Sequence, residues 1–206
     1  MRVASNGHGG EQPMMAKLNG PARMTRDSDL DAQTLEACRR GDRGAFRLVF
    51  DAYRDRVYSL ALHFSGNESA AKDIAQQVFL TLFTHINQFR GKAQFATWLF
   101  RVVINACIDE HRRQRRYLPE EVAPEPAAGS NQEETCANRE VAAYVQSATA
   151  RLAPKLRAAL LLRHLEELSY DEIAAVLGCS PGTVASRLNR AHRALGYELG
   201  QILGGG

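Results

Sequence analysis

The feature that most restricts the fold is a pair of helical patterns separated by a glycine near the C-terminus. In YDEIAAVLG, which begins at Tyr170, apolar residues recur at the spacing of one helix face and stop at Gly178. Glycine readily adopts the left-handed backbone that closes a helix, and Ser180 followed by Pro181 is typical of the start of the next helix. This spacing predicts a helix-turn-helix unit.

The second helix of this unit has an apolar side and a polar side. Val184, Leu188, Ala191 and Leu195 recur at the spacing of a buried face. The N-terminal half of a recognition helix meets base edges in duplex DNA, where arginine can bind guanine or phosphate. A structural helical hairpin would show the same pattern, but small polar residues beside two arginines favour DNA binding. The predicted duplex-DNA contacts are Ser180, Thr183, Ser186, Arg187 and Arg190.

A second stretch, from Phe89 to Arg116, combines aromatic residues with positive charge on one predicted helix. It holds seven Lys and Arg against Asp109 and Glu110, a local balance of +5, whereas the whole chain carries only +3. Lys and Arg neutralise phosphates, and an aromatic face can stack on an unpaired base for roughly 1 to 3 kcal/mol. The stretch therefore indicates a surface for unpaired nucleic acid. The alternative is an ordinary helix core that ends in solvated arginines.

The N-terminal half of the chain shows only helical periods. The spacing predicts a helix from about Asp29 to Arg40, a long amphipathic helix over 46–64, and a third helix capped by Asn67 or Ser69 and running to about His85. The third helix carries a second stripe that mixes polar groups with two large apolar residues. An exposed apolar pair with a polar rim indicates a protein partner, although the pair could instead pack under a neighbouring helix. This stripe consists of Asp73, Gln76, Gln77, Leu80, Phe83 and Thr84.

The composition changes sharply after residue 117. The next 22 residues contain three prolines and five glutamates against one arginine, which predicts a flexible acidic linker that reaches at most roughly 70 Å. The first 27 residues are rich in Gly, Asn and Pro and predict a disordered leader. We therefore expect an all-α fold of two small helical domains, at 28–117 and 140–200, with the linker at 118–139 and the helix-turn-helix in the second domain.

Several classes of protein are not indicated. No run of about 18 apolar residues is present and the N-terminus has no secretory pattern, so we expect a cytoplasmic protein without membrane insertion. The four cysteines are far apart and form no CxxC pair, which favours buried, reduced thiols. Neither a catalytic constellation nor a metal-ligand spacing is evident, so we expect no enzyme activity and no cofactor.

Taken in order, these motifs resemble bacterial RNA polymerase sigma factors of the extracytoplasmic-function (ECF) group in the sigma-70 family. AAKDIAQQVFLTLF is similar to the polymerase-binding helix of region 2, and FRGKAQFATWLFRVVINACIDEHRRQRR to the part of region 2 that binds and melts the minus-ten element. LAPKLRAALLLRHLEELSYDEIAAVLGCSPGTVASRLNRAHRAL is similar to region 4, which reads the minus-thirty-five element. The resemblance covers about Asp29 to Leu199. Gln77 departs from it, because the family usually has Glu or Asp there.

The resemblance implies a transcription initiation factor whose partners are core RNA polymerase, promoter DNA and an anti-sigma factor. The implied polymerase contacts are Asp73, Gln76, Gln77, Leu80 and Phe83. The implied contacts for binding and melting the minus-ten element are Arg90, Lys92, Phe95, Thr97, Trp98, Arg101, Asn105, Arg112 and Arg113. The helix-turn-helix residues named above would bind the minus-thirty-five element.

The main alternative is a helix-turn-helix regulator of the response-regulator type, which is not a polymerase subunit. Such a protein would normally carry a receiver domain of alternating strands and helices, whereas the N-terminal half here has only helical periods. The linker also leads us to expect that the two domains of the free protein sample many separations. A single docked arrangement would instead favour self-inhibition.

Overall fold

The computed structural model describes residues 32–89, 94–117 and 136–203, and within these ranges all regular secondary structure is helical. The predicted all-α fold class is confirmed. The predicted leader and most of the predicted linker lie outside the described residues. The elements are α1 (Ala32–Arg39), α2 (Arg43–Ser65), α3 (Glu68–His85), the 3-10 turn η1 (Ile86–Gln88), α4 (Phe95–Tyr117), α5 (Cys136–Arg151), α6 (Pro154–His164), α7 (Tyr170–Leu177) and α8 (Pro181–Leu203).

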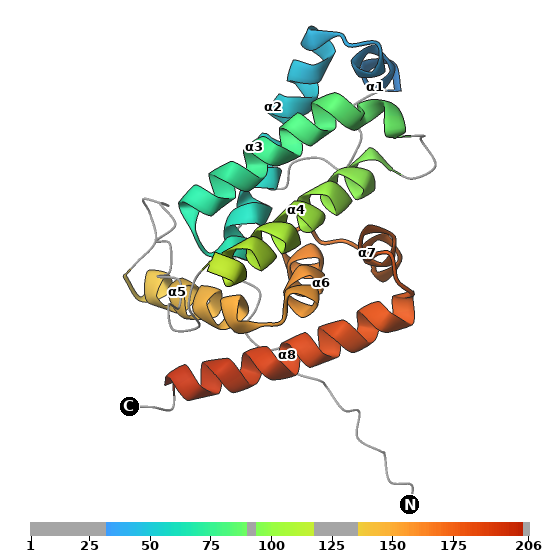
Figure 1. The fold of residues 1–206 in the computed structure, drawn as a ribbon. Helices are drawn as coiled ribbons and strands as arrows, with labels where there is room; N and C mark the ends of the chain where they lie inside the picture. The colour runs from blue at the N-terminus through green and yellow to red at the C-terminus, as the bar shows by residue number, and fades with distance from the viewer. Residues whose placement is uncertain (1–31, 90–93, 118–135, 204–206) are drawn as a thin grey trace, which may run out of the picture.

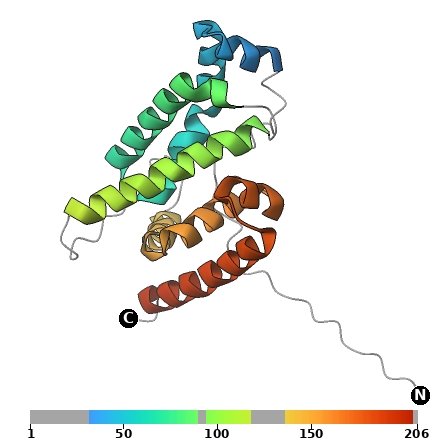
Figure 2. The same cartoon turned by 45° about the vertical axis from the view of Figure 1, so that its right-hand side comes forward.

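The helices form two groups in chain order, with α1–α4 above and α5–α8 below (Figures 1 and 2). α2 and α3 lie side by side, joined through Gly66, which has a φ of 70° that favours glycine. α4 lies between these helices and the C-terminal group, where it contacts α7 and α6. The N-terminal core contains the fully buried side chains of Phe64, Leu82 and Phe100.

Local sequence explains where several helices begin. The Asp42 side chain accepts hydrogen bonds from the backbone N–H groups of Gly44 and Ala45 at 2.7 and 3.0 Å, which caps α2. Of the two predicted caps for α3, Asn67 is the one used, because its side chain accepts from the Ala70 N–H at 2.9 Å. These side chains satisfy backbone donors that have no partner inside a helix.

The predicted linker at 118–139 ends earlier than expected. Helix α5 begins at Cys136, so the last residues of the predicted linker are helical. The apolar residues along α5 are only partly buried, since Val141 and Tyr144 are exposed while Ala148 and Leu152 are buried. Among the α5 residues whose side chains are described, those near the C-terminal end are therefore the ones buried by neighbouring helices.

The two groups of helices share a hydrophobic core. Ile173 and Val176 of α7 and Leu162 of α6 belong to the same buried cluster as Val57 of α2 and Val103 of α4. A smaller cluster lies between α5, α6 and α8. The expectation that the two domains of the free chain sample many separations does not fit this arrangement, because apolar side chains of both groups of helices are buried against each other.

Candidate nucleic-acid interface

A groove of about 580 Å³ runs between α2 and α3. Aromatic rings form its floor: Phe46 meets Phe83 edge to face at 5.1 Å between ring centroids, and Phe50 lies 4.7 Å from Phe79. Charged and polar side chains surround this apolar floor. The lining residues are Phe46, Phe50, Arg54, Asp55, Tyr58, Lys72, Ala75, Gln76, Phe79, Leu80 and Phe83.

The second stripe of α3 faces this groove and the solvent. Leu80 is 53% exposed and Phe83 is 50% exposed, so the prediction that this apolar pair is exposed is confirmed. Asp73, Gln76 and Gln77 are exposed on the same helix, and Gln77 Nε2 donates to Thr81 Oγ1 at 3.3 Å. An exposed apolar pair with a polar rim is the composition of a protein-binding patch.

Three aromatic rings meet where α4 begins. The Phe89, Phe95 and Trp98 ring centroids lie 5.5 to 5.9 Å from one another, and Tyr53 of α2 lies 5.6 Å from Phe95. Phe89 and Phe95 are buried, whereas Trp98 keeps part of its surface in solvent. The cluster therefore fixes the Trp98 indole on a rigid aromatic support.

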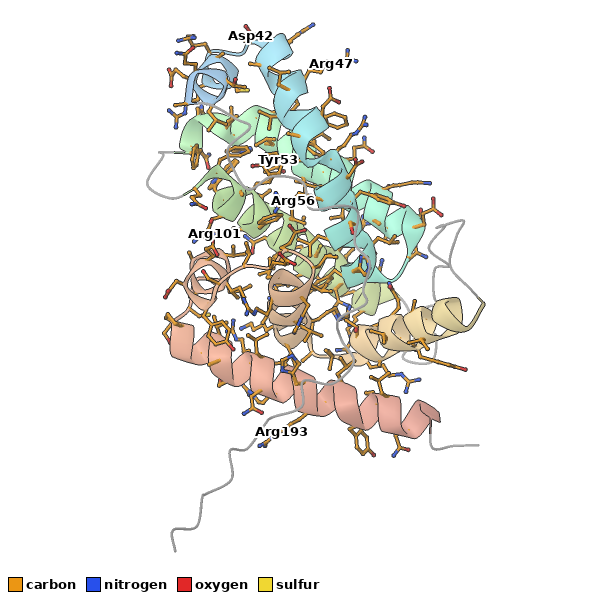
Figure 3. The ribbon with its side chains drawn as sticks, turned by 180° about the vertical axis from the view of Figure 1, so that it is seen from behind. Asp42, Arg47, Tyr53, Arg56, Arg101 and Arg193 are labelled. Atoms are coloured by element: carbon orange, nitrogen blue, oxygen red, sulfur yellow. The ribbon has the colours of Figure 1, made fainter. Side chains whose placement is uncertain are left out.

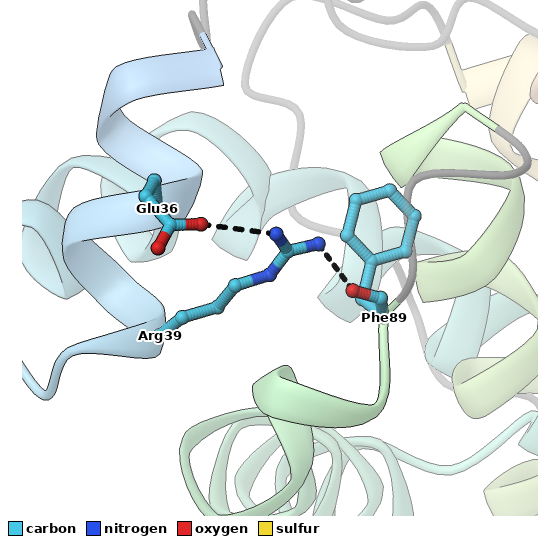
Figure 4. Close-up of polar contacts among 3 residues, drawn as sticks. All are labelled: Glu36, Arg39 and Phe89. Atoms are coloured by element: carbon cyan, nitrogen blue, oxygen red, sulfur yellow. Dashed lines mark hydrogen bonds and ion pairs between the residues drawn. The ribbon is translucent and has the colours of Figure 1, made fainter.

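An arginine of α1 holds the chain immediately before the start of this basic region (Figure 4). Arg39 Nη1 donates to Glu36 Oε2 at 3.0 Å, and Arg39 Nη2 donates to the Phe89 carbonyl oxygen. The guanidinium also lies over the Phe89 ring, 5.5 Å from its centroid. α1 thus positions the residue that leads into the predicted DNA-melting segment.

The predicted minus-ten residues fall into different environments. Phe95 and Thr97 are buried, so direct DNA contact by these two side chains does not fit the structure. For Phe95 the physical reason is that the Tyr53 and Phe89 rings pack against it. Arg90 and Lys92 lie outside the described residues. The exposed members of the set are Arg101, Asn105, Arg112 and Arg113.

The described arginines of this set make contacts within the protein, two within α4 and one with α7. Arg112 pairs with Asp109 at 3.3 Å and Arg113 with Glu110 at 2.8 Å, each three residues earlier on α4. These pairs are exposed at the arginine and contribute little to stability. Arg101 instead donates from Nη2 to the carbonyl oxygen of Ala175 in α7. One predicted DNA contact is therefore engaged by the C-terminal half.

The helix-turn-helix has the predicted turn chemistry. Ser169 and Glu172 form a reciprocal capping box at the start of α7, and Gly178 ends that helix with a φ of 60°. Ser180 Oγ accepts from the Thr183 N–H at 3.2 Å, which caps α8. The sequence pattern therefore predicted both ends of the turn correctly.

The predicted core side of α8 is buried, whereas its predicted outward side is only partly exposed. The predicted apolar face of Val184, Leu188, Ala191 and Leu195 is buried. Arg190 and Ser186 are exposed, whereas Arg187 is partly covered and donates to Cys179 Sγ at 3.5 Å.

One exposed arginine on α8 was missed by the sequence analysis. Arg193 lies three residues beyond Arg190 and points away from the rest of the molecule (Figure 3). The i, i+3 spacing of the three arginines along α8 could have indicated a longer basic face.

The cysteines and histidines whose side chains the structure describes show no ligand cluster. Cys38 and Cys107 are buried free thiols, as predicted, and burial raises the pKa of Cys107 to about 12. Cys179 is partly exposed. Within the described ranges, no three His, Cys, Asp or Glu side chains are grouped to hold a metal ion. None of the described helices is long and apolar enough to cross a membrane.

Two histidines connect α6 to α8 and predict a pH dependence. His164 Nε2 lies 3.0 Å from His192 Nε2, a hydrogen bond that exists only while one ring supplies an acceptor nitrogen. Burial, His192 and Arg163 lower the pKa of His164 in the folded state. A lowered histidine pKa means that the unfolded chain binds more protons, so stability falls as the pH falls from about 6.5 through the folded pKa.

We expect His192→Gln to reduce the loss of unfolding free energy between pH 7 and pH 5, measured by urea denaturation followed by circular dichroism. Some loss should remain because burial and the nearby charges of Arg157 and Arg115 also lower the pKa of His111. An identical pH dependence in the variant and the original chain would contradict a role for the histidine pair.

An apolar groove, a basic helix with an aromatic cluster and a helix-turn-helix in one helical chain define a DNA-binding protein that also binds protein. Comparison with known families gives two matches, to Sigma-70 region 2 over residues 49–117 and to Sigma-70, region 4 over residues 142–195. The ECF RNA polymerase sigma factor SigW of Bacillus subtilis is 32% identical over 176 residues, which are 80% of this chain and 94% of SigW.

Solved structures agree with the fold. A structure of CnrH in complex with the cytosolic domain of CnrY has a TM-score of 0.64 at 24% identity, over 83% of this chain and 97% of CnrH. The sigma factor RpoE in complex with the anti-sigma factor NepR from Bartonella quintana has a TM-score of 0.59 at 24% identity, over 75% of this chain and 96% of RpoE.

This chain belongs to the sigma-70 family, in its ECF group, and it is a sigma factor for transcription initiation. Sigma factors are generally non-enzymatic initiation factors. The alternative of a response-regulator type is not favoured, because the match to region 2 covers the N-terminal helices and no described residue of that half is in a strand.

Proposed function

We propose that the groove between α2 and α3 binds core RNA polymerase, that the exposed side of α4 binds and melts the minus-ten element, and that α8 reads the minus-thirty-five element. The observation that carries the proposal is the groove itself, with Leu80 and Phe83 about half exposed. A protein that only bound duplex DNA through its helix-turn-helix would have no need of an exposed apolar pair on a different helix. The polymerase contacts are Asp73, Gln76, Gln77, Leu80 and Phe83.

On α4, Trp98 and Asn105 are the proposed contacts to opened DNA. Trp98 has exposed indole surface beside a rigid aromatic cluster, and Asn105 is exposed about two turns further along the helix. An unpaired base can stack on such a ring, whereas Arg112 and Arg113 can bind backbone phosphates. Phe95 and Thr97 act in this proposal by holding the first turn of α4, and Arg90 and Lys92 complete the basic segment.

On α8, the proposed duplex contacts are Ser180, Thr183, Ser186, Arg187 and Arg190. Arg190 is exposed on the side of the helix opposite the buried Leu188 and Ala191. Arg187 must leave its contact with Cys179 or bind phosphate from its present position. Arg193 extends the same basic face and is added to this set.

We also infer that an anti-sigma partner regulates this chain in the cytoplasm. The solved RpoE structure is a complex with an anti-sigma factor, and its fold is shared by this chain. Such a partner would compete with polymerase if it covered the same apolar groove. Competition between a purified candidate inhibitor and core polymerase for the chain would test this inference.

The proposed function is tested by adding the purified chain to bacterial core RNA polymerase and fragmented genomic DNA of the encoding organism. We expect one-to-one binding to core polymerase and transcripts whose start sites share two upstream sequence elements. The proposal would be contradicted if the chain bound duplex DNA but did not bind core polymerase and directed no promoter-specific transcripts.

Arg190→Ala should weaken binding to the upstream element of such a promoter. A bidentate contact to guanine contributes about 1 to 3 kcal/mol of discrimination, or roughly 5- to 150-fold in affinity. Fluorescence anisotropy at several salt concentrations measures the loss. Arg43→Ala, which removes an exposed charge at the start of α2, is the matched control and should change affinity little. An equal loss on unrelated DNA, with a shallower salt dependence, would assign Arg190 to phosphate instead.

A further inference from the structure

The short helix α1 precedes the part of the chain that matches Sigma-70 region 2, yet it contacts the stretch that combines aromatic residues with positive charge. α1 ends at Arg39, whereas the match begins at residue 49. The Arg39 guanidinium donates to the carbonyl oxygen of Phe89, 50 positions further along the chain (Figure 4). None of the proposed polymerase or DNA contacts comes from α1, so this link requires an explanation of its own.

The C-terminal end of α1 has a fixed position relative to α2. Cys38 of α1 is buried in the hydrophobic core. The Asp42 N–H donates to the Ala37 carbonyl oxygen at 3.1 Å, across a turn in which Gly41 has a φ of 83° that favours glycine. Because the Asp42 side chain also caps α2, one residue connects the end of α1 to the start of α2. Arg39 therefore extends from a rigid base.

Phe89 is held through both its backbone and its ring. Its N–H donates to the Ile86 carbonyl oxygen at 3.1 Å, and its own carbonyl oxygen accepts from Arg39 Nη2. Phe89 follows η1 with an extended backbone, at φ −70° and ψ 107°, so the helical ladder supplies no donor for that carbonyl group. The Arg39 guanidinium supplies the donor and also lies over the Phe89 ring, 5.5 Å from its centroid.

The Phe89 ring in turn supports the Trp98 indole. The two ring centroids lie 5.8 Å apart with the planes tilted by 47°, and Phe89 also meets Phe95 edge to face at 5.5 Å. Aromatic pairs prefer offset or edge-to-face arrangements, so each ring of the cluster restricts the orientation of the others. Phe89 is buried, whereas Trp98 keeps part of its surface in solvent. A shift of Phe89 would therefore change how the exposed indole is held.

Stability alone does not account for the contacts of Arg39. Its side chain is 30% exposed and that of Glu36 is 51% exposed, so their ion pair at 3.0 Å is screened by solvent and contributes little. Among the described residues, Arg39 Nε is buried without a hydrogen-bond acceptor, which costs free energy. The remaining contacts of the guanidinium are directed at Phe89. They therefore fix the position of that residue more than they stabilise the fold.

We propose that Arg39 is a positioning residue for promoter melting, which holds Phe89 so that the Trp98 indole is oriented to stack on an unpaired base. The inference rests on the proposed function, because it assumes that Trp98 contacts opened DNA. A small displacement of a positioned group can lower a rate by a large factor. α1 thus acts on the opening of the minus-ten element without contacting DNA itself.

The free chain gives the first test, because Trp98 is its single tryptophan and its fluorescence reports on the aromatic cluster alone. Arg39→Ala should shift the emission maximum to longer wavelength and increase the quenching of Trp98 by acrylamide, since loss of the Phe89 support exposes more of the indole. Arg40→Ala is the matched control. It removes the same charge from the exposed neighbouring residue and should leave the emission and the quenching unchanged.

Promoter opening gives the second test, with core polymerase and a promoter found in the transcription experiment above. Arg39→Ala should slow the appearance of permanganate-reactive thymines about tenfold, the effect expected for one hydrogen bond from a charged group. Affinity for core polymerase and formation of the closed complex should not change. Arg39→Lys keeps the charge without the planar fork of donors and should open at an intermediate rate. Glu36→Gln should have a smaller effect than Arg39→Ala, because the ion pair that it removes is exposed.

Each contrary outcome has a distinct meaning. Unchanged Trp98 fluorescence or an unchanged opening rate in folded Arg39→Ala would overturn the inference, and so would equal losses of closed and open complexes. Circular dichroism shows whether each variant is folded, and Arg39→Lys serves as the test variant if Arg39→Ala is not. Failure of the original chain to open any promoter would count against the proposed function, while the fluorescence of the free variants would still show whether Arg39 positions Trp98.

Discussion

Leu80→Arg is expected to lower the affinity for core RNA polymerase by about 100-fold, or roughly 2.7 kcal/mol, while leaving the chain folded. Leu80 is 53% exposed in the free protein, so a longer charged side chain can be accommodated without entering the core. In a complex, the same arginine would be buried among Phe46, Phe79 and Phe83 without a partner for its charge. Sedimentation or surface plasmon resonance with purified core polymerase measures the loss.

Leu48→Arg is the matched control for this prediction. Leu48 is similarly exposed, at 58%, but it lies on α2 outside the groove lining. The same substitution there should leave polymerase affinity within about threefold of the original value. Equal losses in both variants would indicate a general effect of charge, and normal affinity in Leu80→Arg would remove the groove from the polymerase interface.

Local patterns were sufficient for the helix-turn-helix and for the exposed stripe of α3. Gly178 and Ser180 determine the turn through their own backbone and side-chain chemistry, so residues close in sequence carry the whole signal. Leu80 and Phe83 were predicted to be exposed because a second apolar stripe cannot share the core-facing side of one helix. Both structural predictions depend only on helical spacing.

Which side chains are buried at the start of α4 could not be predicted from helical spacing in the same way. Phe95 and Trp98 were both candidates for stacking on bases, yet Phe95 is covered by Tyr53 and Phe89, whereas Trp98 keeps exposed surface. Tyr53 is on a different helix, and its position relative to α4 is a tertiary property. The sequence therefore predicted the kind of surface without distinguishing the residues that support it from those that can reach DNA.

The docking of the two halves was also missed, for a related reason. Arg56 of α2 forms an ion pair with Glu166, which lies between α6 and α7. The two residues are 110 positions apart, and neither interrupts a local pattern. An acidic segment rich in proline between two helical domains predicts that the domains are separate. Its composition does not indicate that polar groups of one domain pair with polar groups of the other. Such pairs appear only once the helices have been placed in three dimensions.

Arg157 of α6 is buried and forms a hydrogen bond with α2 of the other group of helices. Its substitution is the change for which we expect the largest effect on stability. The Arg157 side chain is only 3% exposed. Its guanidinium donates hydrogen bonds to the carbonyl oxygens of Phe64, Ala150 and, at 3.2 Å, Leu152. Burial lowers its pKa to about 10, so the side chain remains charged at neutral pH. These hydrogen bonds offset the cost of burying that charge.

Arg157→Ala should reduce the free energy of unfolding by about 3 to 5 kcal/mol, because it leaves buried carbonyl groups without donors and a cavity beside Phe64. Urea denaturation followed by circular dichroism measures this loss. Arg157→Lys, which keeps the charge but cannot reach all the carbonyl oxygens, should lose less. Lys155→Ala on the exposed side of the same helix should change stability by at most about 0.5 kcal/mol. A loss that small in Arg157→Ala would mean that solvent already reaches these carbonyl groups and that the two halves are not docked in solution.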